Sequence, residues 1–273
     1  MDKEMLKEEV KAYWEVNVCE TIYTDQLKYT KEYFEEIENF RYWVTPEVLG
    51  FAQFTRFRDK KILEIGVGAG TDFLQWVRAG AEAYGIDLTK AAVEHTKARL
   101  KLYGLRAKEL SVGDAEKLPY EDNTFDLVYS WGVLHATPDT EKALHEAVRV
   151  TKPNGRIKIM VYNRWGILML FKWLEVNFLK RRFPKSLTWC LYNDVESKGM
   201  KGYTYGEIRR ILSSYPVKIA ALEGRVNRRD LLQVQPKPFN ALPFRAFAYL
   251  LACLMGFNRA GFFMTIELTK NEK

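Results

Sequence analysis

The stretch KILEIGVGAGTD, residues 61–72, decides the fold expected for this chain. Its apolar first half indicates a buried strand over residues 60–66, and the apolar residues that follow Asp72 at helical spacing indicate a helix over residues 72–78. Three glycines, Gly66, Gly68 and Gly70, connect the two. Glycine lets the backbone turn tightly and approach a ligand with no Cβ in between, so the stretch predicts a strand–loop–helix unit with a ligand site in its loop.

The spacing of these glycines limits the classes of ligand that the loop can bind. A dinucleotide fingerprint would need a further glycine at position 71, where the chain has Thr71. A phosphate-binding loop would need Gly-Lys-Ser/Thr, which is absent. The pattern is GxGxG preceded by the acid Glu64, and it suits a cofactor that presents no phosphate to the loop.

Strands and helices alternate beyond this unit. The predicted helices cover residues 72–78, 90–103, with Thr89 as its N-cap, and 139–150. The predicted strands cover residues 60–66, 83–87, 108–112, 125–130 and 156–162, the last one after a turn at residues 152–155 (KPNG). This alternation predicts an α/β fold in which helices cover both faces of a parallel sheet.

Two acidic residues follow successive predicted strands. Asp87 ends the second strand, where a carboxylate can accept both hydroxyls of a ribose, and Asp114 follows the third strand, where it can accept a hydrogen bond from an adenine amino group. Ligands of open α/β sheets bind outside the carboxyl ends of the strands. The glycine loop, Asp87 and Asp114 therefore predict one nucleoside site.

Residues 61–162 resemble the class I S-adenosylmethionine-dependent methyltransferases, and are similar to the ubiquinone/menaquinone C-methyltransferase type of small-molecule enzyme. The resemblance rests on ILEIGVGAGTD, GIDLT, VGDAEKLPYEDNTFDLVYSWGVLHATPD and KPNGRIKIMVYNR. It implies a Rossmann-like fold with a mostly parallel seven-stranded sheet, closed by strands at 217–222 and 262–269. It also implies S-adenosyl-L-methionine as cofactor, and in-line methyl transfer to an O, N, C or S nucleophile of a small molecule.

The resemblance further implies which residues hold the cofactor. The glycine loop would contact the methionine part, Asp87 the ribose, Asp114 the adenine, and Ser130–Trp131 the sulfonium. The full expected set is Glu64, Gly66, Gly68, Ala69, Gly70, Asp87, Leu88, Asp114, Ala115, Ser130 and Trp131.

Histidine and tyrosine supply the candidates for the chemistry. His135 follows the fourth strand, and it is expected to act as a base or as a structural hydrogen-bonding residue. Relatives often carry a second histidine after it, where this chain has Ala136. Tyr33 and Tyr42, in an aromatic N-terminal segment, are candidate lid or substrate contacts. The other histidines, at positions 95 and 145, are expected on the surfaces of helices.

Three regions are expected within one structural domain: a helical lid (1–58), the S-adenosylmethionine-binding core (59–163), and a cap or substrate region (164–273) that includes the last two strands. The last region carries 19 Lys and Arg but only 8 Asp and Glu. Its basic amphipathic stretch, residues 165–185, fits either a cap helix lining a substrate pocket or docking on a membrane surface. A helix candidate follows at residues 243–256. The charge suits an anionic acceptor, and the aromatic content, 14%, suits an apolar aromatic one.

The cysteine content and the lengths of the apolar runs argue against a metal-binding protein, a disulfide-stabilised protein and a membrane-spanning protein. Cys19, Cys190 and Cys253 match neither a metal-ligand spacing nor a disulfide framework, so no metal site is predicted and a reducing, cytoplasmic compartment is expected. The charged N-terminus has no signal-peptide core, and no run of 18 apolar residues predicts a spanning helix.

Other functions are set against the leading one. An RNA methyltransferase would explain the basic last third, but the chain lacks an Asn/Asp-Pro-Pro-Tyr type motif and a separate RNA-binding module. A thiol or arsenite acceptor would call for paired cysteines. A non-catalytic S-adenosylmethionine-binding scaffold would have no need of both an intact glycine loop and Asp87.

Overall fold

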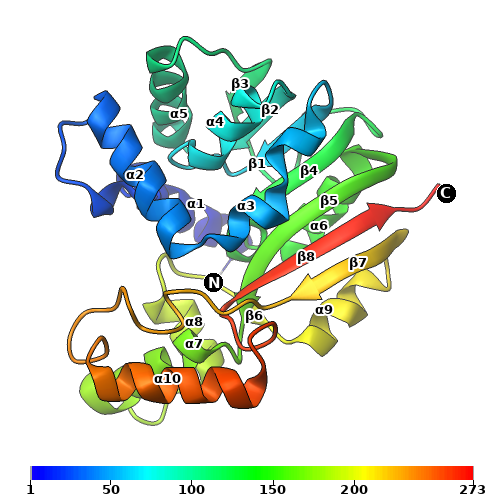
Figure 1. The fold of residues 1–273 in the computed structure, drawn as a ribbon. Helices are drawn as coiled ribbons and strands as arrows, with labels where there is room; N and C mark the ends of the chain where they lie inside the picture. The colour runs from blue at the N-terminus through cyan, green and yellow to red at the C-terminus, as the bar shows by residue number, and fades with distance from the viewer. Residues whose placement is uncertain (1, 273) are drawn as a thin grey trace.

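The structure, a computed structural model, describes residues 2–272 (Figure 1). A single sheet runs through the molecule. Its strands are β1 (Lys61–Ile65), β2 (Glu82–Asp87), β3 (Glu109–Val112), β4 (Phe125–Trp131), β5 (Thr151–Asn163), β6 (Gly202–Tyr203), β7 (Val217–Glu223) and β8 (Phe263–Lys270).

Helices surround this sheet. The α-helices are α1 (Lys3–Val16), α2 (Lys31–Val44), α3 (Glu47–Ala52), α4 (Thr71–Arg78), α5 (Lys90–Leu102), α6 (Thr140–Val150), α7 (Ile167–Leu174), α8 (Leu187–Asp194), α9 (Tyr205–Leu212) and α10 (Leu242–Met255). Shorter helical turns are η1 (Thr21–Tyr23), η2 (Phe54–Phe57), η3 (Leu134–Ala136) and the π-helical η4 (Glu175–Leu179).

The strand order is β3-β2-β1-β4-β5-β8-β7. The first five strands in this order pair in parallel, whereas β8 runs antiparallel to both of its neighbours, β5 and β7. The predicted fold is thus confirmed, including the antiparallel pair of β7 and β8 that closes the sheet. The sequence pattern did not indicate β6, which pairs with the end of β5 over two residues.

Both faces of the sheet are buried, as the parallel arrangement requires. On one face, apolar residues of α6 and α9 pack against the strands around Val128 and Ile159. On the other face, α4 packs around Trp76, which is completely buried among aromatic rings of the α3–η2 region and β4.

One predicted turn is wrong. Residues 152–155 lie within β5 and not before it. Phe125 pairs with Thr151 and Leu127 with Arg156, so the extra residues form a bulge between the two pairs. Asn154 adopts a left-handed φ of 61° there. Asparagine tolerates this conformation better than most residues, which is why the same residues read as a turn.

The N-terminal helices and the helices α7, α8 and α10 lie on the side of the molecule at which β1 and β5 have their carboxyl ends, whereas α9 lies beside β7, as Figure 1 shows. Within residues 2–272, no helix is both long enough and apolar enough to cross a bilayer.

Candidate active site

A cavity of about 600 Å³ lies at the carboxyl ends of the central strands. This volume is typical of small-molecule sites. Three parts of the chain line it: the glycine loop and neighbouring strand ends, the segment from α1 to α2, and the region from α7 to β8. The cavity therefore joins the predicted nucleoside site to a second space formed by the N- and C-terminal regions.

The glycine loop forms the floor of one end. Gly66 has a φ of +81°, and a Cβ there would lie 2.1 Å from Cγ2 of Val133. At Gly68 (φ +50°) a Cβ would lie 3.3 Å from Cβ of Cys19, a residue of the N-terminal segment. Backbone conformation and space together thus demand glycine, and Cys19 stands directly over the loop.

Asp87 is fixed beside this loop. Its Oδ2 accepts a hydrogen bond from the Gly68 amide at 3.1 Å, and its Oδ1 accepts from the amide and hydroxyl of Thr89 at 2.9 and 2.8 Å. Burial raises the pKa of the Asp87 carboxyl above its ordinary value. The carboxylate is therefore aimed into the cavity and also holds the loop in shape.

Asp114 lies on the cavity wall but is shared with α1. Its Oδ2 forms a 2.8 Å ion pair with Nζ of Lys7, which also reaches Glu116 at 3.0 Å. Its Oδ1 accepts from the Glu116 amide. The acid predicted to contact adenine is thus also one of the residues that hold α1.

Glu64 closes the floor below the glycine loop. Its Oε2 accepts a hydrogen bond from Nε1 of Trp76 at 2.8 Å. Burial, and next the negative charge of Asp72, raise the pKa of the Glu64 carboxyl well above its ordinary value.

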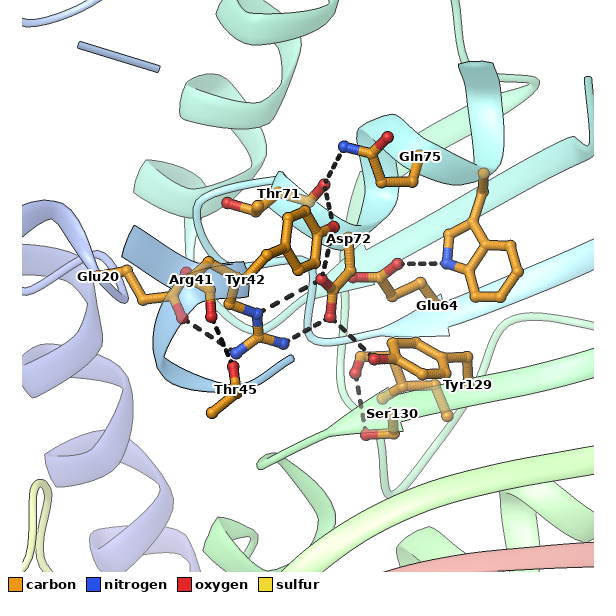
Figure 2. Close-up of polar contacts among 12 residues, drawn as sticks. Glu20, Arg41, Tyr42, Thr45, Glu64, Thr71, Asp72, Gln75, Tyr129 and Ser130 are labelled. Carbon is orange, nitrogen blue, oxygen red and sulfur yellow. Dashed lines mark hydrogen bonds and ion pairs between the residues drawn. The ribbon is translucent and has the colours of Figure 1, made fainter. Parts of the chain in front are cut away.

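Arg41, which no sequence pattern indicated as a site residue, links α2 to the Glu20 segment and to the start of α4 (Figure 2). Arg41 of α2 donates to Oε1 of Glu20 at 3.0 Å and to Oδ2 of Asp72 at 2.5 Å. Tyr129 and Tyr42 donate their hydroxyls to the same Asp72 carboxylate, at 2.8 and 3.1 Å. Asp72 is therefore fully paired although it is buried, and no local motif could have revealed a partner 31 residues away.

A second acidic group faces the other part of the cavity. Tyr162 of β5 donates its hydroxyl to Oε2 of Glu196 at 2.7 Å, and both residues line the cavity. Glu196 keeps an exposed surface toward the cavity, and partial desolvation raises the pKa of its carboxyl above its ordinary value. Apolar and aromatic side chains form the walls around this pair: Trp131, Met160, Phe171, Phe239, Phe262 and Phe263.

Most of the predicted cofactor residues meet at this cavity. Gly70 and Ser130 do not line it: Gly70 packs against Thr96, and Ser130 donates to the backbone oxygen of Ile65 behind the wall. Those that line the cavity are Glu64, Gly66, Gly68, Ala69, Asp87, Leu88, Asp114, Ala115 and Trp131.

The three candidates for the chemistry are not brought to the cavity wall. His135 is completely buried behind Tyr162, with ring centroids 4.0 Å apart, and burial lowers its pKa to about 3. Tyr33 bonds to Nε2 of His95 at 3.0 Å, and Tyr42 bonds to Asp72. Neither ring nitrogen of His135 has a hydrogen-bond partner within residues 2–272, so the ring packs against Tyr162 without the structural hydrogen bond that was the alternative to a base.

The expectation that His95 lies on the surface is wrong. The side chain is completely buried among the rings of Tyr29, Tyr33 and Phe34. The helical pattern of α5 could not show this, because the covering aromatic residues come from the N-terminal segment.

Comparison with known proteins places this site in context. Residues 63–159 match the family model described as a methyltransferase domain. Over 127 residues the chain is 35% identical to a demethylmenaquinone methyltransferase of Streptomyces avermitilis. The matched region covers 46% of this chain and 52% of that protein. Over 227 residues it is 27% identical to a demethylmenaquinone methyltransferase of Bacillus cereus. This second match covers 76% of this chain and 88% of that protein.

The fold is also similar to that of solved structures. One of them, a SAM dependent methyltransferase from Aquifex aeolicus, superposes with a TM-score of 0.53 at 15% identity, over 87% of this chain and 97% of that one. At this identity the likeness concerns the fold alone.

Proposed function

Because this chain is a class I S-adenosylmethionine-dependent methyltransferase, we propose that it methylates a hydroxylated aromatic ring and that Glu196 accepts the hydroxyl proton. The observation that carries the proposal is the pair of Tyr162 and Glu196 within the aromatic walls of the cavity.

The residues at the glycine-loop end fit the cofactor. The loop offers a cradle without Cβ atoms, and Asp87 offers a carboxylate to the ribose. A carboxylate has about four acceptor positions, and three hydrogen bonds from the protein leave one open on Asp87 for a hydroxyl. S-adenosylmethionine bound here supplies an electrophilic methyl group on its sulfonium.

The walls of the remaining space favour a flat, apolar acceptor. The rings of Tyr162 and Phe262 stack with centroids 4.2 Å apart, and Trp131 meets Phe263 edge to face at 5.9 Å. Aromatic rings pack well in offset or edge-to-face geometry. An aromatic acceptor therefore gains contacts here that an extended polar chain would not.

Glu196 is suited to remove a proton from such an acceptor. One carboxylate oxygen is held by Tyr162, which leaves the other to accept the hydroxyl proton. The raised pKa of the Glu196 carboxyl lies closer to the pKa of the hydroxyl that gives up its proton, which favours general-base action. Loss of that proton places negative charge on the ring oxygen and its neighbouring carbons, where the methyl group is accepted.

The names of relatives support the same substrate class. The Streptomyces and Bacillus proteins are named for methylation of demethylmenaquinone. We propose that this chain also takes a ring of the quinone or phenol kind.

Replacing Glu196 with Gln tests the proposal. The variant keeps an acceptor for the Tyr162 hydroxyl but cannot take a proton, so kcat with a dihydroxyaromatic acceptor should fall about 100-fold. For the parent, kcat should rise with pH through the raised Glu196 pKa, and the variant should lose this rise. Initial rates of methyl incorporation between pH 5 and 8 provide the measurement.

The matched control is Glu175→Gln, because Glu175 also lines the cavity but pairs with Lys172 and Lys180. Its pH profile should match that of the parent. An unchanged profile in Glu196→Gln would remove the proposed base, and methyl incorporation into tRNA instead of aromatic acceptors would overturn the substrate class.

The expected N-terminal lid divides into two parts of different character. In α1, Leu6 and Val10 are the buried residues, and the polar attachments of the helix include ion pairs of Lys3 and Lys7 and hydrogen bonds from two α5 amides to Glu15. In α2, by contrast, Phe34 is completely buried, and its backbone oxygen accepts a hydrogen bond from the buried guanidinium of Arg99 at 3.1 Å. We propose that α1 opens and closes while α2 stays in place.

Hydrogen exchange tests this division. Elements with few buried contacts open locally at low free-energy cost, and lids that shield reactions from water belong to this class. With S-adenosylhomocysteine, amide protection should rise in residues 3–16 and stay unchanged in residues 31–44. The variant Lys7→Met should exchange faster in residues 3–16 even without ligand. Equal protection of α1 in both states would mean that it is fixed packing.

A further inference from the structure

The outer face of α10 is apolar and exposed. Leu254 is 75% exposed, Leu250 52% and Phe247 49%. The inner face carries the small residues Ala248 and Ala252, which are completely buried. Phe244, Leu251 and Met255 pack inward beside these alanines, so α10 carries large apolar residues on its outer face as well as on its inner face, whereas an ordinary surface helix has a polar outer face.

A second exposed apolar group lies in and after η4. Phe178 is 58% exposed and Phe183 65% exposed, and their rings lie 6.0 Å apart. Figure 1 shows α10 and the region of η4 at the same end of the molecule, and α7, which leads directly into η4, packs against α10 through Phe171 and Phe247. Contiguous apolar patches of this kind mark interaction sites on soluble domains.

Positive charge is in excess around this surface, where the acids Glu175 and Asp194 are already paired with Lys172, Lys180 and Arg182. Residues 176–193 and 231–261 contain no Asp or Glu, but they contain seven Lys and Arg. Within residues 2–272, Arg181, Lys237 and Arg245 form no ion pair, and all three are exposed. The surface therefore combines apolar side chains with unpaired positive charge.

The combination of exposed apolar side chains and unpaired positive charge favours an anionic bilayer over a second copy of the chain as the partner of this surface. A second copy of the chain would place like charges opposite each other, which disfavours a symmetric dimer through this face. A helix with an apolar face and flanking basic residues suits the interface of an anionic bilayer, where it lies in the plane of the membrane.

We propose that α10, together with residues 178–183, docks on the surface of an anionic lipid membrane. Phe247, Leu250 and Leu254 enter the boundary between headgroups and acyl chains, and Arg181, Lys237 and Arg245 contact the headgroups. The same end of the molecule also borders the cavity, because Phe171 both lines the cavity and packs against α10. The binding itself does not depend on the nature of the methyl acceptor.

Sedimentation with lipid vesicles tests the proposal. The purified chain should bind vesicles of phosphatidylcholine with about 30% phosphatidylglycerol, and should bind pure phosphatidylcholine at least tenfold more weakly. The double variant Leu250→Glu/Leu254→Glu should lower the partition coefficient about 100-fold, since two buried leucines are lost. The triple variant Arg181→Ser/Lys237→Ser/Arg245→Ser should lower it on the anionic vesicles and leave binding to pure phosphatidylcholine unchanged.

The matched control is Leu49→Glu/Leu102→Glu, which adds the same charge at two exposed leucines outside α10 and η4. It should bind like the parent, and circular dichroism should show that every variant is folded. Failure of the parent to bind anionic vesicles would overturn the proposal. So would a parent dimer that the α10 variant converts to a monomer, because the occupant of the face would then be a second copy.

Discussion

Replacing Asp87 with Ala should weaken binding of S-adenosylmethionine by about 10²- to 10⁴-fold. The carboxylate is expected to accept a ribose hydroxyl, and it holds the Gly68 amide at 3.1 Å. The variant also loses the two hydrogen bonds from Thr89, but affinity should reflect the two that concern the ligand and its loop, the ribose hydroxyl and the Gly68 amide, at roughly 1.5–3 kcal/mol each. Titration calorimetry with S-adenosylhomocysteine measures the change.

Two comparisons separate binding from folding. The affinity of the parent should fall as the pH drops through the raised Asp87 pKa, because the ionised carboxyl accepts the hydroxyl more strongly. Asp87→Asn should flatten this dependence. Replacing Asp114 with Ala should have a smaller effect on affinity, because the partners of Asp114 are Lys7 and the Glu116 amide, so its loss leaves the glycine loop held by Asp87. Unchanged affinity in Asp87→Ala, with thermal unfolding also unchanged, would contradict the ribose assignment.

Replacing Arg41 with Met should lower the free energy of unfolding by about 3–5 kcal/mol. Arg41 is the cationic partner of Asp72, whose side chain is only 5% exposed, and removal of one member of a buried pair leaves an uncompensated charge. Chemical denaturation of the parent and the variant gives the difference.

The second substitution Asp72→Asn supplies the control. Asparagine keeps an oxygen that can accept from Tyr129 and Tyr42 but carries no charge, so the double variant Arg41→Met/Asp72→Asn should be more stable than Arg41→Met alone. If the double variant lost as much stability as the two single changes summed, the ion pair would not be the source of the effect.

The sequence predicted those parts of the molecule that local patterns determine. Apolar runs ending in glycine or acid located β1, β2 and the loop that follows β1, and Thr89 was correctly predicted to cap α5, with its side chain accepting from the Ala92 amide. The order of strand and helix then implied the parallel sheet. Each of these features involves residues that are close together along the chain.

The interior of the cavity could not be predicted in the same way. Arg41 meets Asp72, and Tyr162 meets Glu196, only because helices from the two ends of the chain fold over the sheet. His135 was a candidate base because it follows β4. Whether a histidine at this place faces the ligand or the core depends on the conformation of the turn after the strand, which the sequence pattern does not determine. Here η3 directs it into the core behind Tyr162.

The position of β8 also has a consequence for biosynthesis. β7 pairs with β8 and with no other strand of the path, and β8 lies between β7 and β5. β8 follows β6, β7 and α10 along the chain, so the edge of β5 that β8 covers stays open to hydrogen bonding while these elements are being synthesised. Exposed strand edges favour aggregation of nascent chains. We therefore expect slow translation near residues 217–262 to lower the yield of native protein, although no residue of the finished fold is changed.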